Sequence, residues 1–566
     1  MTTRPPPIAT LHQLLETSVR SYGSRPALGM ALEKPLSYDE FFAAILSARR
    51  TLEEQGLHKG DKVALLGENS PNWGIAYFAI LRLGGVVVPI LPDFPEADVH
   101  HILKDSECRG VLVSSRLAEK VAGFPGNRLQ CVINLDDFRS RTDMIEVEPL
   151  TKFLEKARTL LRRIPEFFGL TEGEAGPGDL AAIIYTSGTS GHSKAVMLSH
   201  RNFIADVVSS DQLVDIHPGD TFLSILPLSH TYEFTLGFLL PLFNGARVAY
   251  VGRTPNPTLL ERICRQEKPE FIVTVPLLLE KIYKKKVLSV IEKNVLTRWV
   301  TRTPLLRGMV FKRIRQRLVD FFGGHLKLMA IGGAPINGEV EKFLRASGYP
   351  YLIGYGMTES SPLLSGGPMG DRTIEVGSAG KPIPGVEIRI DHAGERSGVG
   401  EILARGANVM MGYYQNPGLT AETIDRDGWL HTGDLGRFDR RGNLHVVGRS
   451  KNVIVLANGE NVYTEVVEDK LNASIYVSES LLIDRSGRLE AWVYLDYDLV
   501  DAETRGRSET ERGRHIKDLL ERIRQDVNAQ LPVFAQILRI EEQNEPFEKT
   551  PTHKIKRHLY AHRGEE

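Results

Sequence analysis

The sequence has little cysteine and no arrangement that would pair it. Three cysteines occur among 566 residues, Cys108, Cys131 and Cys264, and they form no CxxC pair. A structural zinc site and a disulfide framework are therefore not expected, and a reducing compartment fits best.

Long hydrophobic runs are also missing. The most apolar stretches, 85–92 and 234–243, are too short to cross a bilayer. The first ten residues contain three prolines and lack the apolar core of a secretory signal. We expect a cytoplasmic protein that at most lies peripherally on the inner face of a membrane.

An excess of charge of either sign is absent as well. Lys and Arg total 70 against 71 Asp and Glu, which argues against a globally basic nucleic-acid binder. Hydrophobic residues make up 42% and charged residues 25%, as in ordinary globular proteins. A chain of this length is expected to form two to four domains.

Short β-branched runs alternate with amphipathic segments along the first two thirds of the chain. The expected strands are 62–66, 85–90, 110–114, 129–135, 180–186, 221–226, 246–251, 271–275 and 326–331. The expected helices are 11–20, 38–54 and 73–83. This alternation predicts an α/β fold, with parallel sheets covered by helices.

The pattern changes after about residue 375. Short strands at 378–390, 400–405 and 443–447 predict a β-rich subdomain, and a mixed segment with a helix at 509–530 follows. We predict a large N-terminal domain, 1–449, and a small mobile α+β C-terminal domain, 450–566. The hinge between them is placed near Lys451.

Residues 185–196 read YTSGTSGHSKAV and follow a buried-looking strand. Glycines let backbone N–H groups approach phosphate oxygens, and hydroxyls and a lysine add donors and charge. The alternative is a polar turn between two strands. The chain contains no Walker A loop, G-x-S-x-G, H-E-x-x-H or G-x-G-x-x-G motif.

This segment resembles the phosphate loop of the adenylate-forming superfamily, whose common form is [YF]TSG[ST]TGxPKGV. The chain departs from it at Ser190, Ser193 and Ala195, but it keeps a hydroxyl at 190 and the lysine at 194. Further family motifs follow in order: PLSHTYEF at 227–234, GGAP at 332–335, GYGMTE at 354–359, GWLHTGD at 428–434, GRSK at 448–451 and KTPTHKIKR at 549–557. The resemblance covers essentially the whole chain and is closest to long-chain fatty acid–CoA ligases.

The resemblance implies a reaction in two halves. A carboxylate attacks the α-phosphorus of ATP to give acyl-AMP and pyrophosphate, and a thiolate, usually of CoA, then displaces AMP. ATP, Mg²⁺ and CoA are the implied cofactors and co-substrates. Because the first half brings anions together, the protein must supply positive charge and placement.

The residues that would hold the β- and γ-phosphates, by resemblance, are Thr186, Ser187, Gly188, Thr189, Ser190, Gly191 and Lys194. Thr358 would donate a hydrogen bond to the α-phosphate. Glu359 would bind Mg²⁺, which takes one or two carboxylates together with phosphates and waters. The alternative for Glu359 is a surface carboxylate that caps a turn.

The nucleoside would bind, by the same resemblance, at Gly333, Ala334, Tyr355, Gly356, Met357, Asp434 and Arg449. Tyr355 would stack on adenine, with core packing as the alternative. Asp434 would accept hydrogen bonds from the ribose hydroxyls, with an Asx turn as the alternative. Arg449 would contact the ribose and phosphate side.

Three residues near the C-terminus are assigned to the later steps. Lys554 would stabilise the charge of the pentacoordinate phosphorus, although a solvated charged tail is the ordinary interpretation of such a cluster. Lys451 would be the hinge about which the C-terminal domain rotates. Gly459 would lie against the pantetheine arm of CoA, or would be an ordinary glycine turn.

Three features favour a long fatty acid as the substrate. The sequence HTYEF at 230–234 resembles the long-chain variant and contains Glu233. His230 and Phe234 would border the acyl pocket, and Phe234 would gate it, although core packing is common for such an aromatic. The third feature is an additional helical segment, 281–317, which long-chain enzymes share.

The segment 281–317 is strongly basic. It holds twelve Lys and Arg residues and one acidic residue, Glu292. A solvated face is the ordinary interpretation. Contact with an anionic membrane is the alternative, and it would suit a substrate dissolved in lipid.

Other functions stay open at this point. One is a fatty acyl-AMP ligase or acyl-carrier-protein synthetase, with a carrier protein as acceptor. Another is aromatic-acid or luciferase-like chemistry. The third belongs to another class, a non-catalytic lipid-binding homologue, and ATP–pyrophosphate exchange separates it from the enzymes.

Overall fold

The computed structural model describes residues 8–560, apart from gaps at 126–128, 141–156, 158–159, 162–163, 165–174, 187–192, 253–255, 284–303, 392–397, 457–458, 486 and 551–553. No helix in these described ranges is both long and apolar enough to cross a membrane.

The first large sheet has the strand order β19-β8-β7-β4-β3-β5-β6. Its strands are β3 (Lys62–Leu66), β4 (Val86–Ile90), β5 (Gly110–Val113), β6 (Cys131–Asn134), β7 (Leu180–Thr186), β8 (Lys194–Ser199) and β19 (Gly412–Tyr413). The pairs from β7 through β6 are parallel, whereas β8 and β19 add antiparallel pairs at one edge. The segment 187–193 therefore joins two antiparallel strands.

The second large sheet has the order β13-β12-β11-β9-β10-β1-β2. Its strands are β1 (Pro26–Met30), β2 (Leu36–Ser37), β9 (Thr221–Ser224), β10 (Arg247–Tyr250), β11 (Phe271–Thr274), β12 (Leu328–Ile331) and β13 (Tyr351–Ile353). All neighbours except β1 and β2 pair in parallel. The carboxyl ends of the parallel strands therefore share one edge, where open α/β sheets bind ligands.

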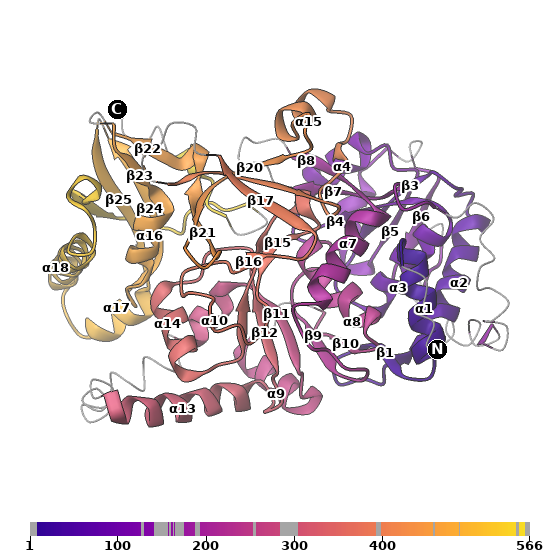
Figure 1. Ribbon diagram of the computed structural model, residues 1–566, viewed down its shortest axis with the longest axis horizontal. Coiled ribbons are helices and arrows are strands. Elements are labelled where there is room, and N and C mark those ends of the chain that lie inside the picture. Colours follow the sequence, from indigo (N-terminus) through magenta and orange to yellow (C-terminus); the bar gives the residue numbers. More distant parts are fainter. Residues whose placement is uncertain are drawn as a thin grey trace.

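Helices pack between and outside the two sheets (Figure 1). The inner helices are α1 (Leu11–Tyr22), α2 (Tyr38–Glu54), α3 (Pro71–Arg82), α7 (His200–Asp211), a π-helical segment (Glu233–Leu239) and α8 (Leu240–Phe243). All twelve residues of α3 are buried, because the helix packs within the main hydrophobic core. On the outer faces lie α4 (Glu96–Asp105), α5 (Glu119–Ala122), α9 (Pro257–Glu267), α10 (Pro276–Ile282), α13 (Pro304–Phe321) and α14 (Gly338–Ser347).

Two small antiparallel sheets follow the second large sheet. One contains β14 (Tyr355–Gly356), β15 (Leu363–Gly366) and β16 (Lys381–Pro382), and the other contains β17 (Val386–Asp391), β18 (Gly400–Gly406), β20 (Leu430–Phe438) and β21 (Leu444–Arg449). The helix α15 (Pro417–Thr423) precedes β20. These sheets are the β-rich subdomain expected from the sequence.

The last part of the chain forms a smaller unit with a core of its own, on the left of Figure 1. It contains β22 (Val453–Val455), β23 (Asn461–Tyr463), α16 (Thr464–Asn472), β24 (Val477–Arg485), β25 (Arg488–Leu495), α17 (Tyr497–Glu503), α18 (Glu509–Asn528) and β26 (Arg539–Glu542). The α/β class, with a large N-terminal domain and a smaller C-terminal one, is confirmed. The boundary at 449/450 and the hinge at Lys451 stay predictions.

The π-helical segment carries a buried carboxyl group against the second large sheet. The side chain of Glu233 is fully buried, and its burial raises its pKa from 4.5 to about 8. The Ser224 hydroxyl on β9 lowers this pKa slightly, yet neither carboxyl oxygen meets a donor in hydrogen-bond geometry within the described part of the chain. Glu233 is therefore protonated at neutral pH.

This burial predicts a pH dependence of stability. Between pH 4.5 and about 8 the folded chain keeps a proton on Glu233 that the unfolded chain has released. The free energy of unfolding should therefore fall as the pH rises through this window, by at most about 1.4 kcal/mol per pH unit from this group. Urea unfolding of the wild type and of Glu233→Gln across these pH values measures the difference. Parallel curves for the two proteins would contradict the prediction.

Candidate active site

The candidate site begins where β12 and β13 end. Gly333 and Ala334 follow β12 and are exposed, and Gly333 has a φ of 83°. An added Cβ at Gly333 would meet only Val275, at 3.6 Å, so the backbone edge is open to a ligand. Tyr355 follows β13 in the same way, because the two strands are parallel neighbours.

The turn after β13 leaves no room for a side chain at Gly356. A Cβ there would lie 1.8 Å from the backbone oxygen of Pro362. The Met357 N–H donates to the same oxygen over 2.9 Å and closes the turn. Thr358 and Glu359 follow and are buried, with exposed fractions of 7% and 6%.

A buried carboxylate joins this turn to the β-rich subdomain. Asp434 on β20 accepts a hydrogen bond from the Tyr355 hydroxyl at 2.8 Å and pairs with Arg449 on β21, with 3.1 Å between Nε and Oδ1. Burial raises the pKa of Asp434, and the charge of Arg449 and the Tyr355 hydroxyl oppose that rise. The two residues sit opposite each other in the β20–β21 register.

The second buried carboxylate, Glu359, is hydrogen-bonded by a residue of the first large sheet. The Tyr413 hydroxyl on β19 donates to Glu359 Oε1 at 2.8 Å, and Lys194 at the start of β8 donates to the Tyr413 oxygen at 3.4 Å. The Lys194 Nζ also lies 5.0 Å from the centre of the Tyr413 ring, within cation–π range. Burial, and then the charge of Glu359, raise the pKa of Tyr413, so the phenol stays protonated.

Lys554 brings a positive charge from the C-terminal unit to the same place. Loss of hydration around its amine lowers the pKa of Lys554 even though the residue as a whole is exposed, and the charge of Arg449 lowers it further. Asp434 and Glu359 act in the opposite sense. Lys554 therefore interacts electrostatically with both buried carboxylates and with Arg449.

His230 lies at the carboxyl edge, after β9. Burial, and then the charge of Lys554, lower its pKa to about 4. The imidazole is therefore neutral at pH 7.

The predicted phosphate loop lies mostly outside the described residues. Ser187, Gly188, Thr189, Ser190 and Gly191 are all in that gap. The two ends are described: Thr186 and Lys194 are register partners in the β7–β8 hairpin, and both are half-buried.

An apolar cavity lies behind the carboxyl edge of the second sheet. Its internal volume is about 50 Å³, and it is partly open on one side. Tyr232, Leu236 and Leu240 on the π-helical segment and α8 form one wall. The sheet residues and α7 form the others: Ser210, Leu213, Val214, Phe222, Phe271, Ile272, Val273, Leu328, Ala330, Ile331, Leu352, Gly354 and Leu363.

Phe234 is absent from the lining of this cavity. Its side chain is 2% exposed and packs among Trp73, Tyr77, Phe203 and Phe238, with 4.3 Å between its ring centre and that of Tyr77. This arrangement favours core packing, the alternative that the sequence left open for Phe234. His230 is not in the lining either.

The residues predicted for the later steps lie at the junction of the two units. Lys451 is exposed within a 3-10 turn (Ser450–Asn452) directly after β21. Beside it, the Ser450 hydroxyl donates to the backbone oxygen of Gly433 at 3.0 Å. Gly459 is exposed in the β22–β23 turn, with a φ of 82° that favours glycine.

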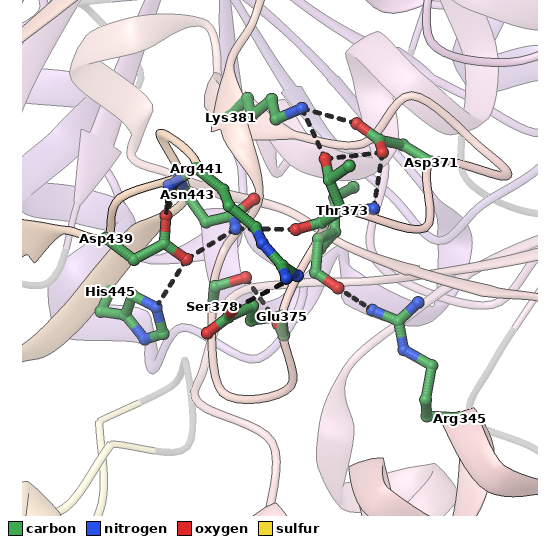
Figure 2. A network of polar contacts seen from close by, with 11 residues as sticks. Arg345, Asp371, Thr373, Glu375, Ser378, Lys381, Asp439, Arg441, Asn443 and His445 are labelled. Atoms are coloured by element: carbon green, nitrogen blue, oxygen red, sulfur yellow. Dashed lines mark hydrogen bonds and ion pairs between the residues drawn. The ribbon is translucent and has the colours of Figure 1, made fainter.

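Glu359 fits a divalent cation because it is an oriented carboxylate with one oxygen engaged by Tyr413. Another group of metal-ligand type, Glu375, Asp439 and His445, has ligand atoms within 4.8 Å of one another. Figure 2 shows that protein contacts already occupy it: Arg441 faces Glu375 at 3.5 Å, and the Asn443 amide donates to Asp439 at 2.7 Å. This network braces the 371–381 loop against the β20–β21 turn.

Sequence reasoning did not single out Tyr413. The signal available was the dipeptide Gly412-Tyr413, but no spacing relates it to Glu359, which is 54 residues away. The contact arises because β19 adds to the edge of the first sheet beside β8.

Comparison with known proteins gives a consistent result. A family model described as AMP-binding enzyme matches residues 15–414. The long-chain-fatty-acid–CoA ligase of Escherichia coli O157:H7 is 31% identical over 493 residues, which cover 81% of this chain and 80% of that protein. The peroxisomal long chain acyl-CoA synthetase 6 of Arabidopsis thaliana is 29% identical over 558 residues, 91% of this chain and 77% of that protein.

Solved structures share the fold. ATP-bound MatB from Rhodopseudomonas palustris superimposes with a TM-score of 0.73 at 23% identity, covering 96% of this chain and 98% of that one. The anthranilate CoA ligase AuaEII in complex with anthranoyl-AMP gives 0.75 at 20% identity, covering 98% and 97%. At this level of identity the likeness concerns the fold alone.

Proposed function

Because the chain belongs to the AMP-binding enzyme family, we propose that it is an acid–thiol ligase for long-chain fatty acids. It joins the acid to ATP as acyl-AMP, releases pyrophosphate, and transfers the acyl group to CoA with release of AMP. The observation that carries the proposal is the position of the apolar cavity: Gly354 lines it, and the next residue, Tyr355, belongs to the polar site. The names of the E. coli and Arabidopsis relatives support the same substrate.

The polar side of the site suits the nucleotide. Tyr355 offers a ring and the Gly333–Ala334 backbone an open edge for adenine, and Asp434 offers carboxylate lone pairs for the ribose hydroxyls. Lys194 and the preceding loop hold the phosphates, and Thr358 donates to the α-phosphate. Arg449 and Lys554 add two positive charges where the charges of the ATP phosphates and of the acid's carboxylate meet.

Mg²⁺ belongs at Glu359. When bound, the ion neutralises phosphate charge and acts as a Lewis acid on phosphoryl oxygens. The protein contributes an oriented, buried carboxylate that is not paired with a cationic side chain in direct contact within the described residues. Phosphates and waters supply the remaining ligands.

Lys554 serves the first half of the reaction by stabilising charge on the phosphorus. The second half requires the thiol to approach the acyl carbon, and the C-terminal unit rotates about Lys451 to admit it, bringing Gly459 to the pantetheine arm. The domain division at 449/450 is part of this proposal. A carrier protein is the alternative acceptor, and a fatty acyl-AMP ligase is the alternative without CoA.

The first test is release of AMP in the presence of ATP, Mg²⁺ and CoA, measured with acids from acetate to stearate and with benzoate. We expect a maximum at long chains that depends on CoA, because the cavity lining is hydrocarbon. If the protein catalyses ATP–pyrophosphate exchange but CoA does not drive AMP release, the acceptor would be a carrier protein or the protein would be an acyl-AMP ligase. Absence of exchange would leave a non-catalytic lipid-binding protein.

One variant in the cavity wall and one matched control outside the cavity test whether the cavity sets the preferred chain length. Leu236→Trp fills the wall of the cavity and should shift the preferred acid to shorter chains. Phe234→Leu lies two residues away but in the aromatic cluster, and should lower stability while leaving the preferred length in place. The same shift in both would show that the cavity is not the acyl site.

A pair of C-terminal variants separates the two half-reactions. Lys554→Ala should slow acyl-AMP formation by about 10²–10³-fold and largely spare thioester formation from supplied acyl-AMP. Lys451→Pro stiffens the hinge and should slow the thioester step more than adenylation. Single-turnover assays of each half measure both. Equal losses in both halves for Lys554→Ala, or an intact second step in Lys451→Pro, would refute the respective role.

We also propose that a basic face of the 281–317 segment contacts anionic lipid at the inner face of a membrane, while the protein itself is cytoplasmic. Of this segment the structure describes 281–283 and α13. Lys312, Arg313 and Arg317 on α13 are exposed, and Met309 beside them is 61% exposed. A cationic face with an apolar side chain matches an anionic membrane surface, where the fatty acid substrate is dissolved.

Flotation with liposomes tests this contact. We expect binding to vesicles that contain anionic lipid and little binding to neutral vesicles. Reversal of charge at Lys312, Arg313 and Arg317 should abolish binding, whereas the same change at Arg514, Lys517 and Arg522, exposed on α18, should not. Binding that is equal on neutral vesicles, or absent on both, would reject the electrostatic contact.

A further inference from the structure

Tyr413 lies between the two residues that the proposed function assigns to phosphate and metal. Its hydroxyl donates to Glu359 Oε1 at 2.8 Å and accepts from Lys194 Nζ at 3.4 Å. The side chain is 3% exposed, so water does not compete for these contacts. Lys194, Tyr413 and Glu359 thus form a continuous hydrogen-bonded chain across two strands and a turn.

The same segment also fixes the backbone of Glu359. The Met410 N–H donates to the Glu359 backbone oxygen at 2.9 Å. Tyr413 itself is held by pairing of β19 with β8 and by its backbone N–H, which donates to the Thr420 hydroxyl at 2.9 Å. Glu359 is therefore oriented at both its backbone and its carboxylate by residues 410–413.

We propose that Tyr413 is a positioning residue that presents Glu359 to the metal through its other carboxylate oxygen and links that carboxylate to Lys194. This inference rests on the proposed function, because it concerns binding of a metal–nucleotide at the same site. Tyr413 makes the binding of nucleotide phosphates at Lys194 and of a divalent cation at Glu359 depend on each other.

The arrangement also favours one metal over another. With Oε1 engaged by Tyr413, Glu359 would offer a cation mainly its other oxygen, which favours monodentate binding. Mg²⁺ takes near-ideal octahedral geometry with few carboxylates, whereas the larger Ca²⁺ readily accepts bidentate carboxylates. Tyr413 therefore selects for Mg²⁺.

Titration calorimetry with a non-hydrolysable ATP analogue tests the proposal without turnover. The dissociation constant is measured with Mg²⁺, with Ca²⁺ and with EDTA for the wild type and Tyr413→Phe. Tyr414→Phe is the matched control, because it removes one hydroxyl from the adjacent residue, whose partner is the exposed Glu107 at 2.9 Å.

We expect Tyr413→Phe to weaken binding of the Mg²⁺–analogue complex by about 10–100-fold, as for other residues that orient a metal ligand. Binding in EDTA should change less than about threefold, and the preference for Mg²⁺ over Ca²⁺ should fall by about tenfold or more. Tyr414→Phe should match the wild type. Equal weakening with Mg²⁺ and EDTA, or no change with either, would overturn the proposal. A wild type that binds no analogue would instead refute the proposed function.

A double-mutant cycle with Glu359→Gln separates positioning from a general structural effect. If Tyr413 acts through Glu359, adding Tyr413→Phe to Glu359→Gln should weaken Mg²⁺–analogue binding little further. Additive losses in the double variant would show that Tyr413 acts independently of Glu359 and would overturn the proposal.

Discussion

The site depends on two carboxylates that are buried beside a sheet edge and need partners there. Glu359 and Asp434 are 6% exposed each, and a buried charge without hydrogen bonds or a counter-charge is costly. Each has acquired partners from a different part of the chain: Tyr413 for Glu359, Tyr355 and Arg449 for Asp434. These partners fix how the first large sheet, the second large sheet and the β-rich subdomain meet.

The helices and strands that could be predicted are those whose apolar residues recur with a helical or strand period along the sequence. Strand β3, helix α2 and strand β7 have the bounds expected from the sequence, because β-branched runs and the amphipathic repeat are local signals. The sequence also predicted the buried strands of both sheets and, from their alternation with helices, a parallel α/β fold. Motif residues such as Tyr355, Asp434 and Arg449 could be named from their order, and Asp434 contacts both of the others.

The sequence could not show in which direction each side chain points. The segment Glu233–Leu239 is a π-helix, whose wider turn changes the relation between spacing and direction. In this segment Tyr232, Leu236 and Leu240 line the cavity, while Phe234 joins the aromatic cluster and Glu233 faces the sheet. Likewise, the contact of Tyr413 with Glu359 follows from an edge strand of two residues, too short to leave a periodic signal.

The distribution of charge leaves both buried carboxylates with partners even without Lys554. Lys554 interacts with both carboxylates, but neither relies on it alone. With Lys554 withdrawn, Asp434 keeps Tyr355 and Arg449, and Glu359 keeps Tyr413 with Lys194 behind it. If the C-terminal unit rotates as proposed, both carboxylates would therefore keep their hydrogen-bond partners, and a small energy difference between two arrangements is what a domain that alternates between two half-reactions requires.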